Sequence, residues 1–216
     1  RVISLNTDYW YYVNFYNYIH MDYPDNSGML RFLTDELFAA EEAGERVWIM
    51  GHVLTGWNGG EALDRPSNLF YQIVSRFAPT TIAHIFFGHT HEDQLQVFYE
   101  NDNGVSASAK QHTQHAVTNA YIAPSITPYI NLNPTFRVYK FHPETFDTMD
   151  YDQYYTPISE FEKLKDADHG PVWRHLYSAR EAYGNFHQSV TDGNYAAGVK
   201  LDGTKWPWNA PLNGTF

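Results

Sequence analysis

Three histidines lie in two short motifs, each at the end of an apolar run. The run VWIM at 47–50 leads into Gly-His, which gives His52, and IAHIFF at 82–87 leads into Gly-His-Thr-His, which gives His89 and His91. Neutral imidazole is a ligand for zinc, iron and related ions. The two motifs therefore predict a metal centre that contains these three side chains.

The strands that carry the motifs are expected to bring them together. Short continuous apolar runs are typical of buried strands in a parallel or mixed sheet, and ligands of open α/β sheets bind beyond the carboxyl ends of such strands. In an extended segment His89 and His91 face the same side, with Cα atoms roughly 6–7 Å apart. Two imidazoles so placed either share one metal or hold one each of two metals about 3.5–4 Å apart. Gly51 and Gly88 permit sharp turns, whereas His84 lies within its strand and is interpreted as a core residue.

The rest of the sequence predicts an α/β core with a helical tail. One helix is expected after Ser27, ending at Gly44, and a second at 68–77 with Asn68 as its N-cap. Residues 7–27 are polar and aromatic and predict a loop. Further strands are predicted at 1–6, 94–99, 116–123, 136–142 and 147–155, with a turn at 101–104.

The C-terminal part of the chain predicts helix and then irregular structure. An apolar stripe at helical spacing indicates a helix that ends at Gly184, and residues 185–216 are rich in Gly, Asn and Pro. The stripe consists of Val172, Leu176, Ala179 and Tyr183.

Composition excludes several kinds of function. The chain has 14 Lys and Arg against 25 Asp and Glu, a formal net charge of −11. This acid excess argues against a nucleic-acid polymer as partner, because phosphate binding needs a basic face. With no Cys, the chain forms no disulfide or thiolate zinc site and offers no Cys nucleophile.

At the histidine motifs the sequence resembles a known family. Gly51-His52 and the Gly-His-Thr-His that begins at Gly88 resemble the last two motifs of the calcineurin-like metallophosphoesterases. Longer segments resemble acid sphingomyelinase and the acid sphingomyelinase-like phosphodiesterases, from residue 1 to about residue 184. These segments are RVISLNTDYWY, GMLRFLTDELFAAEEAGERVWIMGH, YQIVSRFAPTTIAHIFFGHTHEDQLQVFY, APSITPYINLNPTFRVY and HLYSAREAYG.

The resemblance implies a fold and a division into domains. We expect the C-terminal half of a metallophosphoesterase-type β-sandwich flanked by helices, with a small helical C-terminal extension. Residues 1–156 would belong to the catalytic domain, and residues 157–216 would form a helical and irregular subdomain.

The resemblance also implies a site with two zinc ions. His52 and His89 match ligands of the second zinc, and His91 matches a ligand of the first. Tyr129 matches a position that lines the substrate cleft near the phosphate, with Asn131 close by, although a core ring is an equal alternative for Tyr129. The implied reaction is zinc-assisted hydrolysis of a phosphodiester, with sphingomyelin giving ceramide and phosphocholine.

The sequence departs from the family pattern in one important respect. The Asp-x-His, Gly-Asp and Gly-Asn-His motifs that should precede Gly51 are missing. Three neutral imidazoles cannot offset two close divalent cations, and they leave both under-coordinated. We therefore expect the chain to be inactive alone. The catalytic residues would lie in an N-terminal half of the same domain, which acts as the partner of this chain. In one hypothesis that half is the second chain of a nicked enzyme.

Other interpretations remain open at this stage. The substrate could be a nucleotide or another soluble phosphodiester, or the chain could be a non-catalytic fragment with a structural or binding role. Asn213-Gly214-Thr215 is the sole glycosylation sequon, which together with the resemblance favours a secreted or lysosome-like location. For a lipid substrate, aromatic side chains could form a rim that contacts a membrane surface: Trp10, Tyr11, Tyr12, Trp57 and Phe70. Core or ordinary surface positions are the alternative for these side chains, and for Phe70 the core is favoured.

Overall fold

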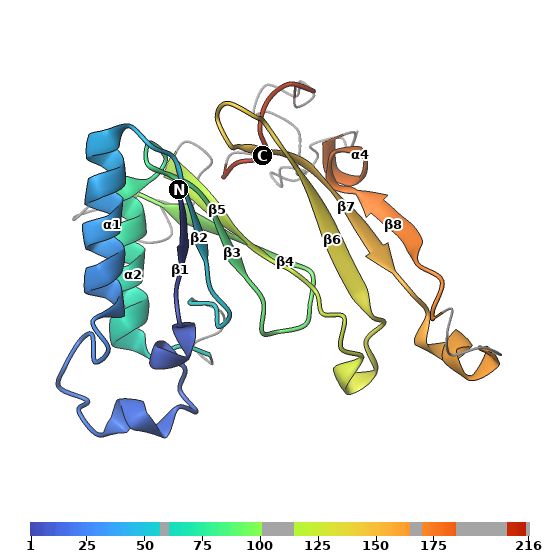
Figure 1. Ribbon diagram of the computed structural model, residues 1–216, viewed down its shortest axis with the longest axis horizontal. Coiled ribbons are helices and arrows are strands. Elements are labelled where there is room, and N and C mark those ends of the chain that lie inside the picture. The colour runs from blue at the N-terminus through green and yellow to red at the C-terminus, as the bar shows by residue number, and fades with distance from the viewer. Residues whose placement is uncertain (57–60, 101–114, 165–169, 185–206, 215–216) are drawn as a thin grey trace, which may run out of the picture. The chain divides into compact units, whose positions relative to one another are not determined.

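The computed structural model describes residues 1–56, 61–100, 115–164, 170–184 and 207–214. The described chain forms two compact units, one over residues 1–122 and one over residues 123–214. Both contain β-sheet, and the first also carries two long helices (Figure 1). The predicted α/β class is therefore confirmed.

A mixed five-stranded sheet forms the centre of the first unit. The strand order is β1-β2-β3-β5-β4, in which β4 alone runs antiparallel to its neighbour. The carboxyl ends of β1, β2 and β3 thus meet at one edge, as the histidine motifs require. The strands are β1 (Val2–Ser4), β2 (Val47–Met50), β3 (Ile82–Phe87), β4 (Gln94–Tyr99) and β5 (Ala116–Ile122).

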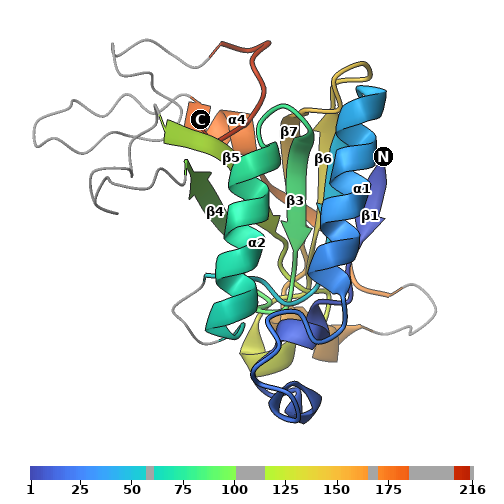
Figure 2. The same cartoon turned by 90° about the vertical axis from the view of Figure 1, so that its left-hand side faces the viewer.

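Helices α1 (Met29–Ala43) and α2 (Asp64–Phe77) lie side by side on one face of this sheet (Figures 1 and 2). Leu33 and Leu37 of α1 and Phe70 of α2 are fully buried. Burying a side chain of this size contributes about 1.5–3 kcal/mol. These contacts fix the helices against the sheet and so set the positions of the loops that lead into them.

The two helices differ in how well the sequence predicts them. Gly44, with φ 66°, ends α1 as expected. By contrast, α2 begins at Asp64 rather than after Asn68. Pro66 is tolerated there because the first helical turn needs no backbone donors, and Asp64 interacts favourably with the positive end of the helix dipole. The buried face is correspondingly built on Phe70, Val74 and Phe77.

The segment between β1 and α1 has more structure than the predicted loop. It contains two short 3-10 helices, η1 (Thr7–Trp10) and η2 (Phe15–Tyr18). Figure 1 shows this segment at the carboxyl ends of the first three strands. It therefore lies next to the histidine motifs.

The second unit contains an antiparallel sheet in the order β6-β7-β8. Strands β6 (Thr135–Phe141) and β7 (Thr148–Tyr155) confirm the predicted pair, and a short 3-10 helix, η4 (Tyr129–Asn131), precedes them. Helix η5 (Ile158–Lys163) follows β7.

The predicted helix that ends at Gly184 is largely wrong. Residues Arg174–Ser178 form strand β8, which pairs with β7, and only Ala179–Gly184 form a helix, α4. Val172 and Leu176 are 67% and 52% exposed, so the stripe does not define a buried helix face. Pairing with β7 overrides the local apolar spacing, as tertiary context often does.

The predicted limit at residue 156 does not coincide with the division into units, because β7 and β8 pair across it. The predicted turn at 101–104, most of the irregular tail and Trp57 lie outside the described residues. No helix in the described parts of the chain is long and apolar enough to cross a bilayer.

Candidate active site

The turn after β2 is held by Thr7 of η1. The Thr7 hydroxyl is buried and accepts hydrogen bonds from the backbone N–H groups of His52, at 2.9 Å, and Val53, at 2.7 Å. A Cβ atom on Gly51 would lie 2.6 Å from Cγ2 of Thr7 and 2.9 Å from the Phe87 ring. Only glycine fits this position. Packing therefore requires the glycine before His52, and the close contacts fix the backbone from which the His52 side chain extends.

The turn after β3 has an unusual backbone. His89 and His91 have φ angles of 77° and 63°, in the left-handed region that side chains other than glycine rarely adopt. The prediction of an extended segment over 89–91 is therefore wrong. The alternation of an extended strand does not determine which way the side chains of His89 and His91 point. Left-handed non-glycine residues cost about 1–3 kcal/mol each and cluster at functional sites.

The structure brings His52 and His89 together. Nε2 of His52 lies 3.3 Å from Nδ1 of His89, and the ring planes are 84° apart. In a tetrahedral zinc site with bonds of 2.0–2.1 Å, two ligand nitrogens are roughly 3.3–3.4 Å apart. The two nitrogens are thus spaced as two ligands of one such ion would be.

Glu61 completes this arrangement, and the sequence did not predict it. Its Oε2 atom lies 2.8 Å from Nε2 of His89, and both side chains are less than one-fifth exposed. The loop that carries Glu61 is fixed by the bond from Tyr12 N–H to the Glu61 carbonyl, at 3.1 Å, and by an isolated bridge between Tyr11 and Ala62. A carboxylate on the outer nitrogen of a metal-binding imidazole fixes its tautomer and raises its basicity.

The surroundings favour neutral imidazole at His52. Partial burial lowers the pKa of His52, and the neighbouring His89 and the more weakly acting His91 lower it further, while Asp8 opposes the shift. The neutral ring is the form that binds a metal.

The ring of Tyr11 packs against that of His89. The two ring centroids are 4.8 Å apart in an edge-to-face arrangement. Burial raises the pKa of Tyr11, and Glu61 raises it further. Tyr11 therefore remains a neutral phenol beside the Glu61 carboxylate.

His91 is close enough to influence the pKa of His52. Nevertheless, no group of three or more His, Asp or Glu side chains with metal-binding geometry forms within the described residues. The chain thus supplies a pair of imidazole nitrogens with an outer carboxylate, and this pair leaves most of a metal's coordination positions open.

The other predicted site residues lie in the second unit. Tyr129 is 65% exposed, so the core-ring alternative is wrong. It begins a turn in which Ile130 and Asn131 have φ angles of 55° and 64°. Asn131 and Asn213 are exposed, the latter as a glycosylation site requires, although Thr215 of its sequon lies outside the described residues.

The predicted aromatic rim is wrong at Trp10, whereas the core position favoured for Phe70 is confirmed. Trp10 and Phe70 are fully buried and pack edge to face, with centroids 5.1 Å apart. The Trp10 indole N–H donates to the carbonyl oxygen of Val53, at 3.0 Å. Tyr11 is partly buried and Tyr12 is exposed. The buried rings support the backbone of the histidine turns.

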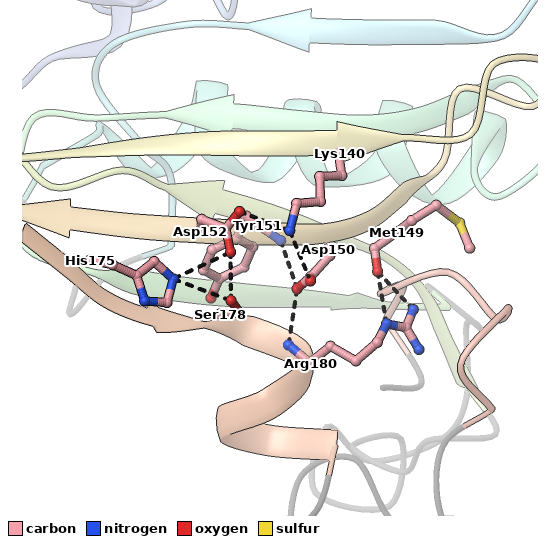
Figure 3. Close-up of polar contacts among 8 residues, drawn as sticks. All are labelled: Lys140, Met149, Asp150, Tyr151, Asp152, His175, Ser178 and Arg180. Carbon is pink, nitrogen blue, oxygen red and sulfur yellow. Dashed lines mark hydrogen bonds and ion pairs between the residues drawn. The ribbon is translucent and has the colours of Figure 1, made fainter.

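A Ser, His and Asp cluster on β7 and β8 has a different geometry from a hydrolytic triad (Figure 3). The Ser178 hydroxyl donates to Asp152, and Nε2 of His175 lies 3.2 Å from Oγ of Ser178 and 3.4 Å from Oδ1 of Asp152. A triad instead uses the two ring nitrogens separately, one for the acid and one for the nucleophile. With Lys140 2.8 Å from Asp152, the cluster joins the three strands and is structural.

Comparison with known proteins identifies the relatives of this chain. No protein-family model matches it. It is 35% identical over 185 residues to sphingomyelin phosphodiesterase 1 of Caenorhabditis elegans, an alignment that covers 85% of the chain and 30% of the relative. It is 35% identical over 188 residues to sphingomyelin phosphodiesterase of Homo sapiens, covering 85% and 27%. The chain is similar to the sphingomyelin phosphodiesterases over most of its length.

The predicted resemblance to sphingomyelinases and acid sphingomyelinase-like phosphodiesterases is therefore confirmed. The human acid sphingomyelinase-like phosphodiesterase 3b is also similar, at 30% identity over 197 residues, 85% of the chain and 39% of that relative. The chain spans less than a third of the length of the Caenorhabditis elegans and Homo sapiens sphingomyelin phosphodiesterases. The alignment with these phosphodiesterases thus concerns one segment of much longer proteins.

Proposed function

We propose that this chain is part of a zinc-dependent phosphodiesterase that hydrolyses sphingomyelin to ceramide and phosphocholine. The observation that carries the proposal is the 3.3 Å separation of His52 Nε2 and His89 Nδ1, in a chain similar to sphingomyelin phosphodiesterases. The metallophosphoesterase-type arrangement, the two-zinc centre and the secreted or lysosome-like location belong to the same proposal.

The donor set fits zinc in its chemistry. His52 and His89 would hold one ion through Nε2 and Nδ1, and His91 would contribute to a second. Zinc held by these residues would supply a Lewis acid for the phosphoryl oxygens. The remaining ligands would come from the part of the protein that carries Asp-x-His, Gly-Asp and Gly-Asn-His, so the chain alone is expected to be inactive.

The residues of this chain orient and protect the site. Glu61 accepts a hydrogen bond from the Nε2–H of His89 and so leaves the lone pair of Nδ1 directed towards His52. Tyr11 packs against the His89 ring and limits the access of water to it. Thr7 holds the backbone at His52, so the imidazole is positioned before any ligand binds. Tyr129 and Asn131 are proposed to contact the substrate.

Soluble phosphodiesters are the second candidate substrates. This candidate rests on the similarity to acid sphingomyelinase-like phosphodiesterase 3b, whose name gives phosphodiester hydrolysis without naming a substrate. Turnover of sphingomyelin against a nucleoside triphosphate by the complete protein separates the two substrates.

The zinc content of the complete protein tests the proposal. We expect two zinc ions per molecule, with His52→Ala and His89→Ala each losing zinc and phosphodiesterase activity. His20→Ala is the matched control, because His20 is exposed and belongs to neither histidine motif. Full zinc content in both site variants would contradict the proposal, and absence of zinc from the unaltered protein would favour the non-catalytic interpretation.

A further inference from the structure

The segment after β1 exposes several large apolar side chains. Phe15, Ile19 and Met21 are 78%, 64% and 62% exposed. Figures 1 and 2 show the short helix η2, which carries Phe15, beyond the N-terminal ends of α1 and α2. A group of exposed apolar side chains of this kind marks an interaction surface. Residues 9–21 are called the aromatic tip, and the question is what covers it.

Tyrosines surround these apolar side chains. Tyr9, Tyr16 and Tyr18 are exposed. The ring of Tyr9 contacts that of Tyr16, with centroids 6.2 Å apart, and Phe15 contacts Tyr18 at 6.4 Å. Tyrosine combines an apolar ring with a polar hydroxyl, so it is enriched where a membrane meets water. The faces of such rings also attract quaternary ammonium groups, including that of choline.

The charges of the segment favour a surface without net charge. The aromatic tip contains no Asp, Glu, Lys or Arg, and His20 is the one side chain in it that protonation makes positive. Asp8 and Asp22 flank the tip on either side. An anionic membrane attracts clusters of Lys and Arg and repels carboxylates. A zwitterionic lipid surface is therefore a better match than an anionic one.

The backbone of the aromatic tip is extensively hydrogen-bonded within the segment. Several N–H groups donate to carbonyl groups three residues earlier. The side chain of Asn14 accepts the Tyr16 N–H at 3.2 Å and donates to the Asp8 carbonyl at 2.8 Å. The Tyr18 hydroxyl donates to the Tyr12 carbonyl at 2.6 Å. Because an unpaired backbone group is costly to remove from water, these bonds lower the cost of entering a lipid interface.

We propose that the aromatic tip docks the protein on a bilayer that presents phosphocholine head groups. Phe15, Ile19 and Met21 enter the interface, and the surrounding tyrosines lie at the level of the head groups. The choice of this lipid rests on the proposed function, in which the substrate carries a phosphocholine head group. Docking itself needs neither zinc nor turnover.

The aromatic tip is joined directly to the candidate active site. The Tyr12 N–H donates to the Glu61 carbonyl at 3.1 Å, and the Tyr11 ring packs against His89 with centroids 4.8 Å apart. Docking of the tip therefore holds the pair of histidines close to the lipid surface that supplies the substrate.

Flotation of the complete protein with phosphatidylcholine vesicles tests the proposal. We expect the unaltered protein to bind, and Phe15→Ser and Ile19→Ser each to bind about tenfold more weakly, at low and at high salt alike. Leu95→Ser is the matched control, because Leu95 is 52% exposed on β4, at the opposite edge of the sheet from β1. Thermal unfolding checks that the variants are folded.

Three results of this experiment would overturn the proposal. The first is failure of the unaltered protein to bind phosphatidylcholine vesicles. The second is binding of both tip variants as tight as that of the control, as expected if another part of the protein or a partner protein covers the tip. The third is a loss confined to low salt, which would assign vesicle binding to charge.

Two further variants locate the contact and separate it from catalysis. The indole introduced by Phe15→Trp should add fluorescence that brominated phosphatidylcholine quenches, whereas that introduced by Leu95→Trp should not be quenched. Equal quenching of the two would overturn the proposal. His52→Ala should lose zinc but bind vesicles as the unaltered protein does. Loss of vesicle binding in His52→Ala would show that the lipid is held through the active site instead, while retained zinc would contradict only the proposed function.

Discussion

Nε2 of His89 lies 2.8 Å from the Glu61 carboxylate, while Nδ1 of the same ring lies 3.3 Å from Nε2 of His52. One imidazole therefore joins an acid on one side to a second imidazole on the other. In metal sites, a carboxylate bound to one ring nitrogen of a histidine orients the other nitrogen towards the metal, and the groups around His89 have this arrangement.

Glu61→Ala should weaken zinc binding by the complete protein about 10–100-fold, the usual effect of removing such a carboxylate. Glu61→Gln keeps an oxygen that accepts the hydrogen bond from His89 and should lose less zinc affinity. A competitive zinc titration measures both, with Glu42→Gln as a control of equal charge change on α1. Unchanged zinc affinity in Glu61→Ala would show that Glu61 does not position His89.

Gly51→Ala should destabilise the protein, because the added methyl group would lie 2.6 Å from Thr7 and 2.9 Å from Phe87. Overpacking of this kind costs about 1–3 kcal/mol. Gly88→Ala is the matched control, since its Cβ would meet only Nδ1 of His52, at an ordinary 3.7 Å. Urea denaturation compares the two variants, and equal stability would mean that the contact at Gly51 relaxes freely.

His91→Gly should be more stable than His91→Ala by about 1 kcal/mol, since glycine adopts the φ of 63° without strain. Comparing the glycine and alanine variants isolates the effect of backbone strain on stability, because both variants lack the imidazole. Thermal unfolding of the two variants measures the difference. A less stable glycine variant would argue against the left-handed conformation at this position.

Asp152→Asn should destabilise the second unit at neutral pH. Lys140 first, and then the Ser178 hydroxyl, lower the pKa of Asp152 in the folded protein. A lowered pKa contributes stability that is complete above the unfolded value of about 3.9 and is lost as pH falls through the folded value. The difference in stability between wild type and Asp152→Asn should therefore shrink below about pH 4. A difference that stays constant between neutral and strongly acidic pH would rule out the ionised carboxylate as its cause.

The sequence predicts the central sheet well because its strands are continuous apolar runs that end in recognisable motifs. The two long helices follow from apolar spacing, although Pro66 within the first turn of α2 concealed its start. Strand β8 was missed because its identity depends on pairing with β7, which local spacing does not encode.

The candidate site was predicted in part. The proximity of His52 and His89 was expected, because each follows glycine at the end of a buried strand. Glu61 was not, since it lies in a loop outside any motif, and only the bond from Tyr12 to its carbonyl and the neighbouring bridge bring it to His89. The left-handed backbone at His89 and His91 was also unexpected, because two-residue spacing carries no information about φ.

Anomalous scattering at the zinc edge from crystals of the complete protein tests the central claim most directly. We expect a zinc ion about 2.0–2.1 Å from both Nε2 of His52 and Nδ1 of His89, with Glu61 still on Nε2 of His89. A zinc centre that leaves either nitrogen outside its coordination sphere, or that binds His89 through Nε2, would contradict the account.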